Sequence, residues 1–268
     1  MIVFSHANGF SGGTYRRLFE GWRAAGQRVV AIERYGHAFG HPIGSNWRGM
    51  TQQLLALIDS VPVPRVWLVG HSMGGYISLI AAGLRPERVS GIVLLDSPIV
   101  SGWKSGIVAL MKVVGQMHRI SPAAMATRRR DRWASVEEAH NHFAKKPMFA
   151  AWHPEVLRDY METGTERDPA DATGMARRLT FRRDVESAIY MTTPHWLVAF
   201  LRRHPLGGPV AFIGGRHSNE IKQAGLVATH RVTHGRISWL PGSHLFPFEH
   251  PDETVREVLG WISRLERL

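Results

Sequence analysis

The 268-residue sequence contains no cysteine, which excludes a disulfide framework, a thiolate metal site and a cysteine nucleophile. It also lacks any apolar run near the ~18 residues that crossing a bilayer requires, so we expect no membrane span. The first residues show no charged segment followed by an apolar run and a cleavage site, so no secretory signal is expected. The expectation is therefore a soluble, cytoplasmic protein.

Acidic residues are few beside basic ones: 22 Asp and Glu oppose 33 Lys and Arg, which gives a net charge of +11. The excess is spread along the chain, with the densest clusters at Arg128–Arg130 and at Arg177, Arg178, Arg182 and Arg183. Nucleic acid or an anionic surface could use such clusters. We favour solvated, arginine-rich helix faces instead, so no nucleic-acid partner is expected.

Short apolar runs alternate with stretches of helical spacing along most of the chain. The helical windows are residues 15–25, 47–60, 74–84 and 254–265. The runs typical of buried strands are Ile2–Phe4, Val29–Ile32, Val66–Val69, Gly91–Leu95, Val210–Ile213 and Ile237–Leu240. This alternation predicts an α/β fold with a mostly parallel sheet and helices on both faces.

The alternation stops near Pro98 and resumes near Pro209. The residues between look helical, show no clear strand and hold seven of the ten methionines and four tryptophans. Because this insertion is too long for a loop, we predict a core of residues 1–98 and 206–268 and a helical cap of residues 99–205. The methionines and tryptophans either line an adaptable apolar pocket or pack the cap helices together.

The motif Gly70-His71-Ser72-Met73-Gly74-Gly75 lies between a predicted strand and a predicted helix. A Gly-x-Ser-x-Gly sequence in that context is typical of a nucleophile elbow, a turn so tight that the flanking residues need to be nearly without side chains. The elbow strains the serine backbone and exposes its hydroxyl near the amides that begin the helix. We therefore predict Ser72 as a nucleophile.

A serine nucleophile needs a base, and His244 is the candidate among 15 histidines. It follows the last predicted strand, in Leu240-Pro241-Gly242-Ser243-His244. Loops after parallel strands open at the same edge of the sheet as the elbow, so His244 is expected beside Ser72. The alternative is an ordinary surface histidine.

The acid that would orient His244 is less clearly marked. Asp96 closes the apolar strand 91–95, and a carboxylate buried there would need a partner. The loop after residues 210–213 holds His217 and Glu220. We prefer Asp96, which keeps the chain order serine, acid, histidine, and retain Glu220 as the second candidate.

The loop His6-Ala7-Asn8-Gly9 directly follows the first strand, so the backbone amides of Asn8 and Met73 are the predicted oxyanion donors. The pairs His230/His234 and His140/His142 have spacings that a metal could use. No carboxylate or thiolate completes either pair nearby, so neither a metal site nor a cofactor is predicted.

Together these motifs resemble the α/β-hydrolase superfamily, in its serine esterase and lipase-like form with a helical cap. The loop at His6–Gly9 looks like the oxyanion loop, Gly70–Gly75 like the elbow, and Gly242–Phe246 like the histidine loop. The resemblance implies that the commonest acid position holds His217 here, and that Asp96 occupies an alternative one. It also implies that two strands usually preceding the oxyanion loop are missing, leaving six.

These residues predict a hydrolase that forms an acyl-enzyme on Ser72. The resemblance excludes dehalogenases and epoxide hydrolases, which carry aspartate at the elbow. A small or medium apolar carboxylic ester is the expected substrate, and thioesters and C–C bonds beside a ketone stay open. The alternative from another class is a binding protein that keeps the fold with weak or no catalysis.

Overall fold

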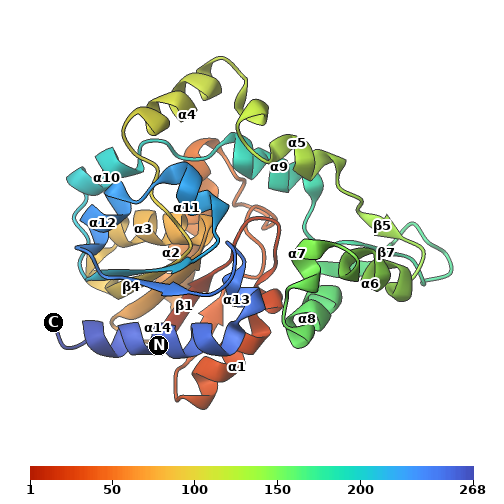
Figure 1. Ribbon diagram of the computed structural model, residues 1–268, viewed down its shortest axis with the longest axis horizontal. Helices are drawn as coiled ribbons and strands as arrows, with labels where there is room; N and C mark the ends of the chain where they lie inside the picture. The colour runs from red at the N-terminus through yellow and green to blue at the C-terminus, as the bar shows by residue number, and fades with distance from the viewer.

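The computed structural model describes residues 1–268 and contains a six-stranded parallel sheet (Figure 1). Its strand order is β2-β1-β3-β4-β8-β9. The strands are β1 (Ile2–Ser5), β2 (Val29–Ala31), β3 (Val66–His71), β4 (Val89–Leu95), β8 (Val210–Gly215) and β9 (Ile237–Leu240). All six predicted strands are present, and every adjacent pair is parallel, which confirms the predicted α/β fold.

Alternate residues of the strands point to opposite faces, where two buried clusters of similar size, 29 and 28 residues, form the core. In β3, for example, Leu68 belongs to one cluster and Val69 to the other. The flanking elements are η1 (Gly12–Tyr15), α1 (Arg16–Ala24), η2 (Ser45–Trp47), α2 (Arg48–Ser60), α3 (Met73–Leu84), η3 (Pro86–Arg88), α11 (Asn219–Ala224), α12 (Val227–Thr233), α13 (Phe246–Glu249) and α14 (Pro251–Leu265). Helices α1 and α14 cover one face, and α2 and α3 cover the other (Figure 1).

Most of residues 99–205 lies at the top and right of Figure 1. The elements of this segment are α4 (Trp103–Val113), η4 (Met117–Arg119), α5 (Ala123–Arg128), β5 (Arg132–Trp133), α6 (Val136–Ala144), α7 (Pro147–Ala150), α8 (Pro154–Gly164), β6 (Thr165–Arg167), β7 (Arg177–Leu179), α9 (Arg183–Met191) and α10 (Leu197–Arg203). The last helix of the segment, α10, lies at the left beside α3. None of the helices in the molecule has the length and apolar character needed to cross a bilayer.

The prediction that residues 99–205 contain no strand is wrong. Strands β5, β7 and β6 form a three-stranded antiparallel sheet. They are two or three residues long and rich in arginine, so they lack the apolar alternation that identifies a half-buried strand. A cross-strand ion pair between Arg178 and Glu166 (2.7 Å) joins β7 to β6. The division into core and cap itself stays a prediction.

Candidate active site

The turn between β3 and α3 holds Ser72 with φ 53° and ψ −117°, a conformation that a non-glycine residue rarely adopts. Neighbouring backbone of the same chain explains why glycines flank Ser72. A Cβ added at Gly74 would lie 2.0 Å from the carbonyl oxygen of Ser5, and one at Gly70 would lie 2.5 Å from Gly74. The Ser72 hydroxyl does not cap α3. The predicted elbow geometry is therefore present, with the hydroxyl left available.

Asn8 and Met73 line the same cavity as Ser72, and Met73 directly follows Ser72 in the chain. Neither of their backbone amides donates a hydrogen bond in the loops, turns or helix caps. Met73 begins α3, so its amide carries the partial positive charge of that helix end. That these two amides bind an anionic oxygen formed at Ser72 stays a prediction.

The side chain of Asn8 fixes its loop to α9. Its Nδ2 donates to the carbonyl oxygen of Glu186 at 3.0 Å, and the Glu186 carboxylate forms an ion pair with Arg129 (2.7 Å). A Cβ added at Gly9, which has φ +83°, would lie 2.8 Å from this carboxylate. Residues 99–205 thus contact the oxyanion loop directly.

Asp96 is fully buried and adopts φ 39° at the end of β4. Its carboxylate accepts three hydrogen bonds, from His244 Nδ1 (2.8 Å), the Ser218 hydroxyl (2.6 Å) and the Gly215 amide (2.7 Å). These donors offset the cost of burying the charge, and they hold the carboxylate facing the imidazole. The structure therefore brings Asp96 and His244 together.

Glu220 lies close to the same imidazole but in a different environment. Its Oε2 is 3.8 Å from His244 Nδ1, beyond hydrogen-bond distance, and its side chain is 47% exposed. His217 stands where the resemblance described above would most often place the acid, and it is exposed. The geometry favours Asp96 over Glu220 as the partner of His244.

Opposing effects act on the pKa of His244. Burial lowers the pKa, whereas the hydrogen bond and charge of Asp96, together with the charges of Glu220 and Glu249, raise it, and the net shift is upward. Because Nδ1 donates to Asp96, the Nε2 atom of the neutral ring is the basic one. That tautomer is the one a general base needs.

A buried chain of hydrogen bonds links the three loops of the site. The Ala7 amide donates to the Tyr15 hydroxyl (3.1 Å), which in turn lies 2.7 Å from His71 Nδ1. His71 Nε2 is 2.9 Å from the carbonyl oxygen of His244 and donates to it. Burial, with the nearby His244, keeps the pKa of His71 well below its ordinary value, so the ring is neutral. The oxyanion loop, the elbow and the histidine loop are thereby held together.

His6 anchors the oxyanion loop from its other side. Its Nδ1 donates to the Ala7 carbonyl (2.8 Å), and its Nε2 accepts from the Tyr35 amide (3.0 Å). Burial lowers the pKa of His6 to about 4. The His6 ring is therefore neutral at physiological pH and links Ala7 to Tyr35.

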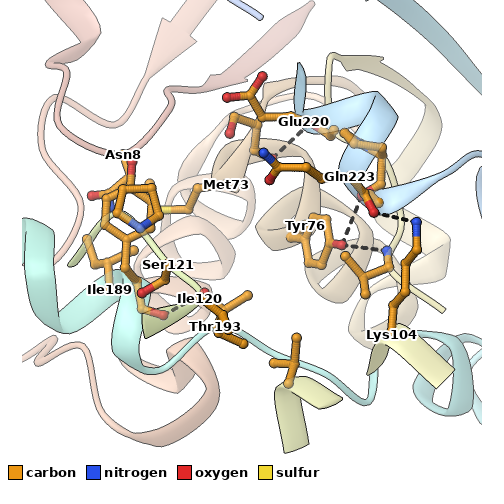
Figure 2. A pocket seen from close by; sticks show the side chains of 18 of the residues that line it. Asn8, Met73, Tyr76, Lys104, Ile120, Ser121, Ile189, Thr193, Glu220 and Gln223 are labelled. Carbon is orange, nitrogen blue, oxygen red and sulfur yellow. Dashed lines mark hydrogen bonds between the residues drawn. The ribbon is translucent and has the colours of Figure 1, made fainter. Parts of the chain in front are cut away.

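Ser72, Asp96 and His244 border a cavity of about 450 Å³ with mainly apolar walls. Figure 2 shows Asn8 and Met73 on one side of it and Lys104 and Gln223 on the other. The lining residues from 99–205 include Trp103, Ile107, Val108, Met117, Ile120 and Ile189. The sequence left open whether the methionines and tryptophans of this region line a pocket or pack its helices together. Met117 and Trp103 line the cavity, whereas Trp133 and Trp152 are buried away from it.

One group of side chains has metal-ligand spacing: the ligand atoms of Asp96, Glu220 and His244 lie within 4.8 Å of one another. In that group His244 Nδ1 already donates to Asp96. The histidine pairs at 230/234 and 140/142 belong to no group of three potential ligands. The arrangement is suited to proton transfer.

Sequence reasoning missed several residues that support the site. Ser218 donates to Asp96 and Tyr15 bridges two loops, but neither lies in a motif. The Tyr15–His71 contact joins residues 56 positions apart, so no local pattern could have indicated it. His71 was visible only as the variable position of the elbow.

The fold and this constellation define an α/β protein with a serine elbow, an acid–histidine pair and an open cavity above them. The model of the "Alpha/beta hydrolase family" matches residues 2–257. The chain belongs to that family.

Similar proteins include an acetyltransferase and a lipase. The chain is 40% identical over 78 residues to the dihydrolipoyllysine-residue acetyltransferase component of the acetoin cleaving system of Pseudomonas putida, covering 28% of this chain and 20% of that protein. It is 33% identical over 107 residues to the monoglyceride lipase of Rattus norvegicus, covering 37% and 35%. The chain thus spans well under half the length of these relatives.

Among solved structures, the thioesterase domain from the curacin biosynthetic pathway is similar, with a TM-score of 0.73 at 16% identity. The match covers 96% of this chain and 90% of that one. At this identity the likeness supports the fold alone.

Proposed function

We propose that the protein is a serine hydrolase that cleaves a carboxylic ester, or a related acyl bond, through an acyl-enzyme on Ser72. The observation that carries the proposal is that Ser72, in its strained turn, shares an apolar cavity with His244, whose Nδ1 donates to the buried Asp96. Membership of the α/β-hydrolase family, which includes a monoglyceride lipase among the similar proteins, supports acyl chemistry.

In the first half-reaction, Nε2 of His244 accepts the Ser72 proton while Oγ attacks the substrate carbonyl carbon. The amides of Asn8 and Met73 bind the oxygen of the tetrahedral intermediate. His244 then gives the proton to the leaving alcohol, and the acyl group stays on Ser72. Asp96 stabilises the imidazolium formed in between.

In the second half-reaction, water attacks the acyl carbon and His244 Nε2 accepts its proton. The proton passes to Ser72 Oγ as the ester bond breaks, releasing the carboxylic acid. Apart from the attacking water, the residues of the chain supply every catalytic group in this cycle, so the proposal includes no cofactor.

The cavity supports a small or medium apolar acyl substrate, because about 450 Å³ of mainly apolar space accommodates such a group. The same triad acts on thioesters, and a panel of oxoesters and thioesters with matched acyl chains separates the two. A higher kcat/KM for oxoesters is expected. A consistent preference for thioesters at every chain length would move the assignment to a thioesterase.

The decisive test is covalent labelling with a fluorophosphonate, followed by intact-mass measurement. This reagent requires an activated serine and an oxyanion hole but no knowledge of the substrate. We expect one adduct per chain in the native protein and none in Ser72→Ala. The matched control is Ser121→Ala, a serine that lines the same cavity and donates to the Met117 carbonyl. An unlabelled, folded native chain would favour a binding protein.

A further inference from the structure

Helix α4 presents an apolar face to solvent. No residue of α4 is buried. Trp103 is 72% exposed, Leu110 58% and Val113 85%, and Ile107 and Val114 are also exposed. These positions follow helical spacing, so they form one continuous stripe along the outer side of the helix. A water-exposed stripe of this kind marks an interaction surface.

The inner side of α4 is held by lysines. Lys104 donates to the carbonyl of Gln223, and Lys112 donates to Asn46 Oδ1 at 3.0 Å. The two lysines therefore lie on the protein side of the helix, whereas Leu110 and Val113 are exposed to solvent. Figure 1 shows α4 at the outer edge of the molecule, away from the sheet.

The chain around α4 carries charge of one sign. Residues 97–130 contain six lysines and arginines and no aspartate or glutamate. Of these six, only Arg129 and Arg130 form ion pairs, with Glu186 and Glu138. Arg119 and Arg128 are exposed and have no acidic partner, whereas the two lysines of α4 donate to oxygens on the protein side of the helix. This surface therefore combines an apolar stripe with unneutralised positive charge.

The stripe is continuous with the active-site cavity, because Trp103 and Ile107 belong to both. A ligand that leaves an apolar phase at α4 would therefore enter the cavity that holds Ser72 past Trp103 and Ile107. Apolar side chains with flanking cations, and a tryptophan among them, are the features by which a helix lies in a lipid headgroup layer.

We propose that α4 and η4 dock on an anionic lipid surface and that the cavity receives its substrate from that surface. A second copy of this chain fits less well, because a two-fold contact would set the acid-free segment against itself. Nucleic acid fits less well too, since it would cover the cations but leave the apolar stripe against phosphates. The docking does not depend on the reactivity of Ser72.

The test is co-sedimentation of the full chain with vesicles of phosphatidylcholine, with and without phosphatidylglycerol. We expect binding to the mixed vesicles, and binding at least about tenfold weaker to phosphatidylcholine alone or in high salt, because each cation near the surface adds to the attraction. Leu110→Glu combined with Val113→Glu should weaken vesicle binding at least about tenfold. Neither residue lines the cavity, so turnover of a water-soluble ester should stay within about twofold.

The matched control is Val136→Glu combined with Val227→Glu, which adds the same charge at two exposed valines in α6 and α12. Its binding should equal that of the native chain. Because the chain has no cysteine, Leu110→Cys and Val136→Cys each accept one environment-sensitive fluorophore. Only the label at position 110 should shift to shorter wavelength on vesicles.

Several results would overturn the proposal. These are no binding to the mixed vesicles, equal and salt-insensitive binding to both compositions, or equal losses in the α4 and control variants. A stable dimer in solution that the α4 variant dissociates would assign the stripe to a second copy instead.

Discussion

Helices α3 and α4 both border the cavity that holds Ser72, yet eleven of the twelve residues of α3 are buried and none of α4 is. Helix α3 begins at Met73, and its Gly74 lies directly against the backbone of Ser5. Helix α4 supplies apolar side chains on an exposed support. This difference indicates that groups whose position must be fixed belong to the packed helix α3. Side chains that only line the cavity belong to the exposed helix α4.

The largest expected effect lies on the packed side. Asp96→Asn keeps the shape of the side chain but removes the charge that stabilises the His244 imidazolium, so kcat should fall by about 10⁴. Initial rates on a short-chain ester measure this change. Glu220→Gln is the control and should cost less than about tenfold, since Glu220 makes no hydrogen bond to His244. A larger loss in Glu220→Gln would reverse the assignment of the acid.

Matched glycine substitutions compare the two helices directly. Gly74→Ala brings a Cβ against the Ser5 carbonyl and should lower the free energy of unfolding by about 3 kcal/mol or prevent folding. Gly106→Ala, in α4, meets nothing within 4 Å, so stability should hold or rise by about 0.5 kcal/mol. Urea unfolding followed by circular dichroism gives both values. Similar losses in the two variants would remove the contrast.

Tyr15→Phe deletes the hydroxyl between the Ala7 amide and His71. The two buried polar groups lose their partner, so the free energy of unfolding should fall by about 1–3 kcal/mol. Loosening of the loops should also lower kcat about tenfold. Tyr35→Phe, whose hydroxyl contacts only Ser5, should lower stability by about 1 kcal/mol with little change in kcat. Equal kcat in both variants would show that the buried chain is purely structural.

Trp103→Ala tests the loosely packed side. Because this side chain lines the cavity but is largely exposed, KM for a medium-chain ester should rise severalfold while kcat stays within about twofold. The melting temperature should barely move. A loss confined to kcat would show that Trp103 acts in the chemical step, and it would contradict the proposed difference between α3 and α4.

The smallest expected effect concerns pH. His244 accepts a proton only when neutral, so kcat/KM should rise with pH through a midpoint above the ordinary imidazole value of about 6.5, because its pKa is raised. Glu220→Gln removes one of the charges that raise this pKa, so the midpoint should move down. A midpoint that moves upward in the variant would contradict the assigned effect of Glu220.

The sequence predicted the sheet because each strand is an apolar run between turn residues, and it predicted the elbow because the glycines around Ser72 are local. Asp96 could also be proposed from the sequence, because a carboxylate that ends a buried strand needs hydrogen-bond partners. Strands β5 to β7 were missed because they are two or three residues long, rich in arginine and without apolar alternation. Tyr15 and Ser218 were missed because only the tertiary fold brings them to the site.

The exposed face of α4 could not be predicted from the sequence, for a different reason. Its stripe of Trp103, Ile107 and Leu110 has the spacing of a core-facing helix, and periodicity does not say whether the facing partner is the protein itself. In the structure this stripe is exposed to solvent.

The most direct test of the central claim is to trap the acyl-enzyme. A slowly turned-over activated ester is mixed with the protein, quenched in acid within the first turnover, and digested for peptide mass mapping. We expect a burst of about one alcohol per chain and the acyl mass on the peptide that contains Ser72. Turnover with no acylated peptide, or with the acyl group on another residue, would contradict the proposed acyl-enzyme.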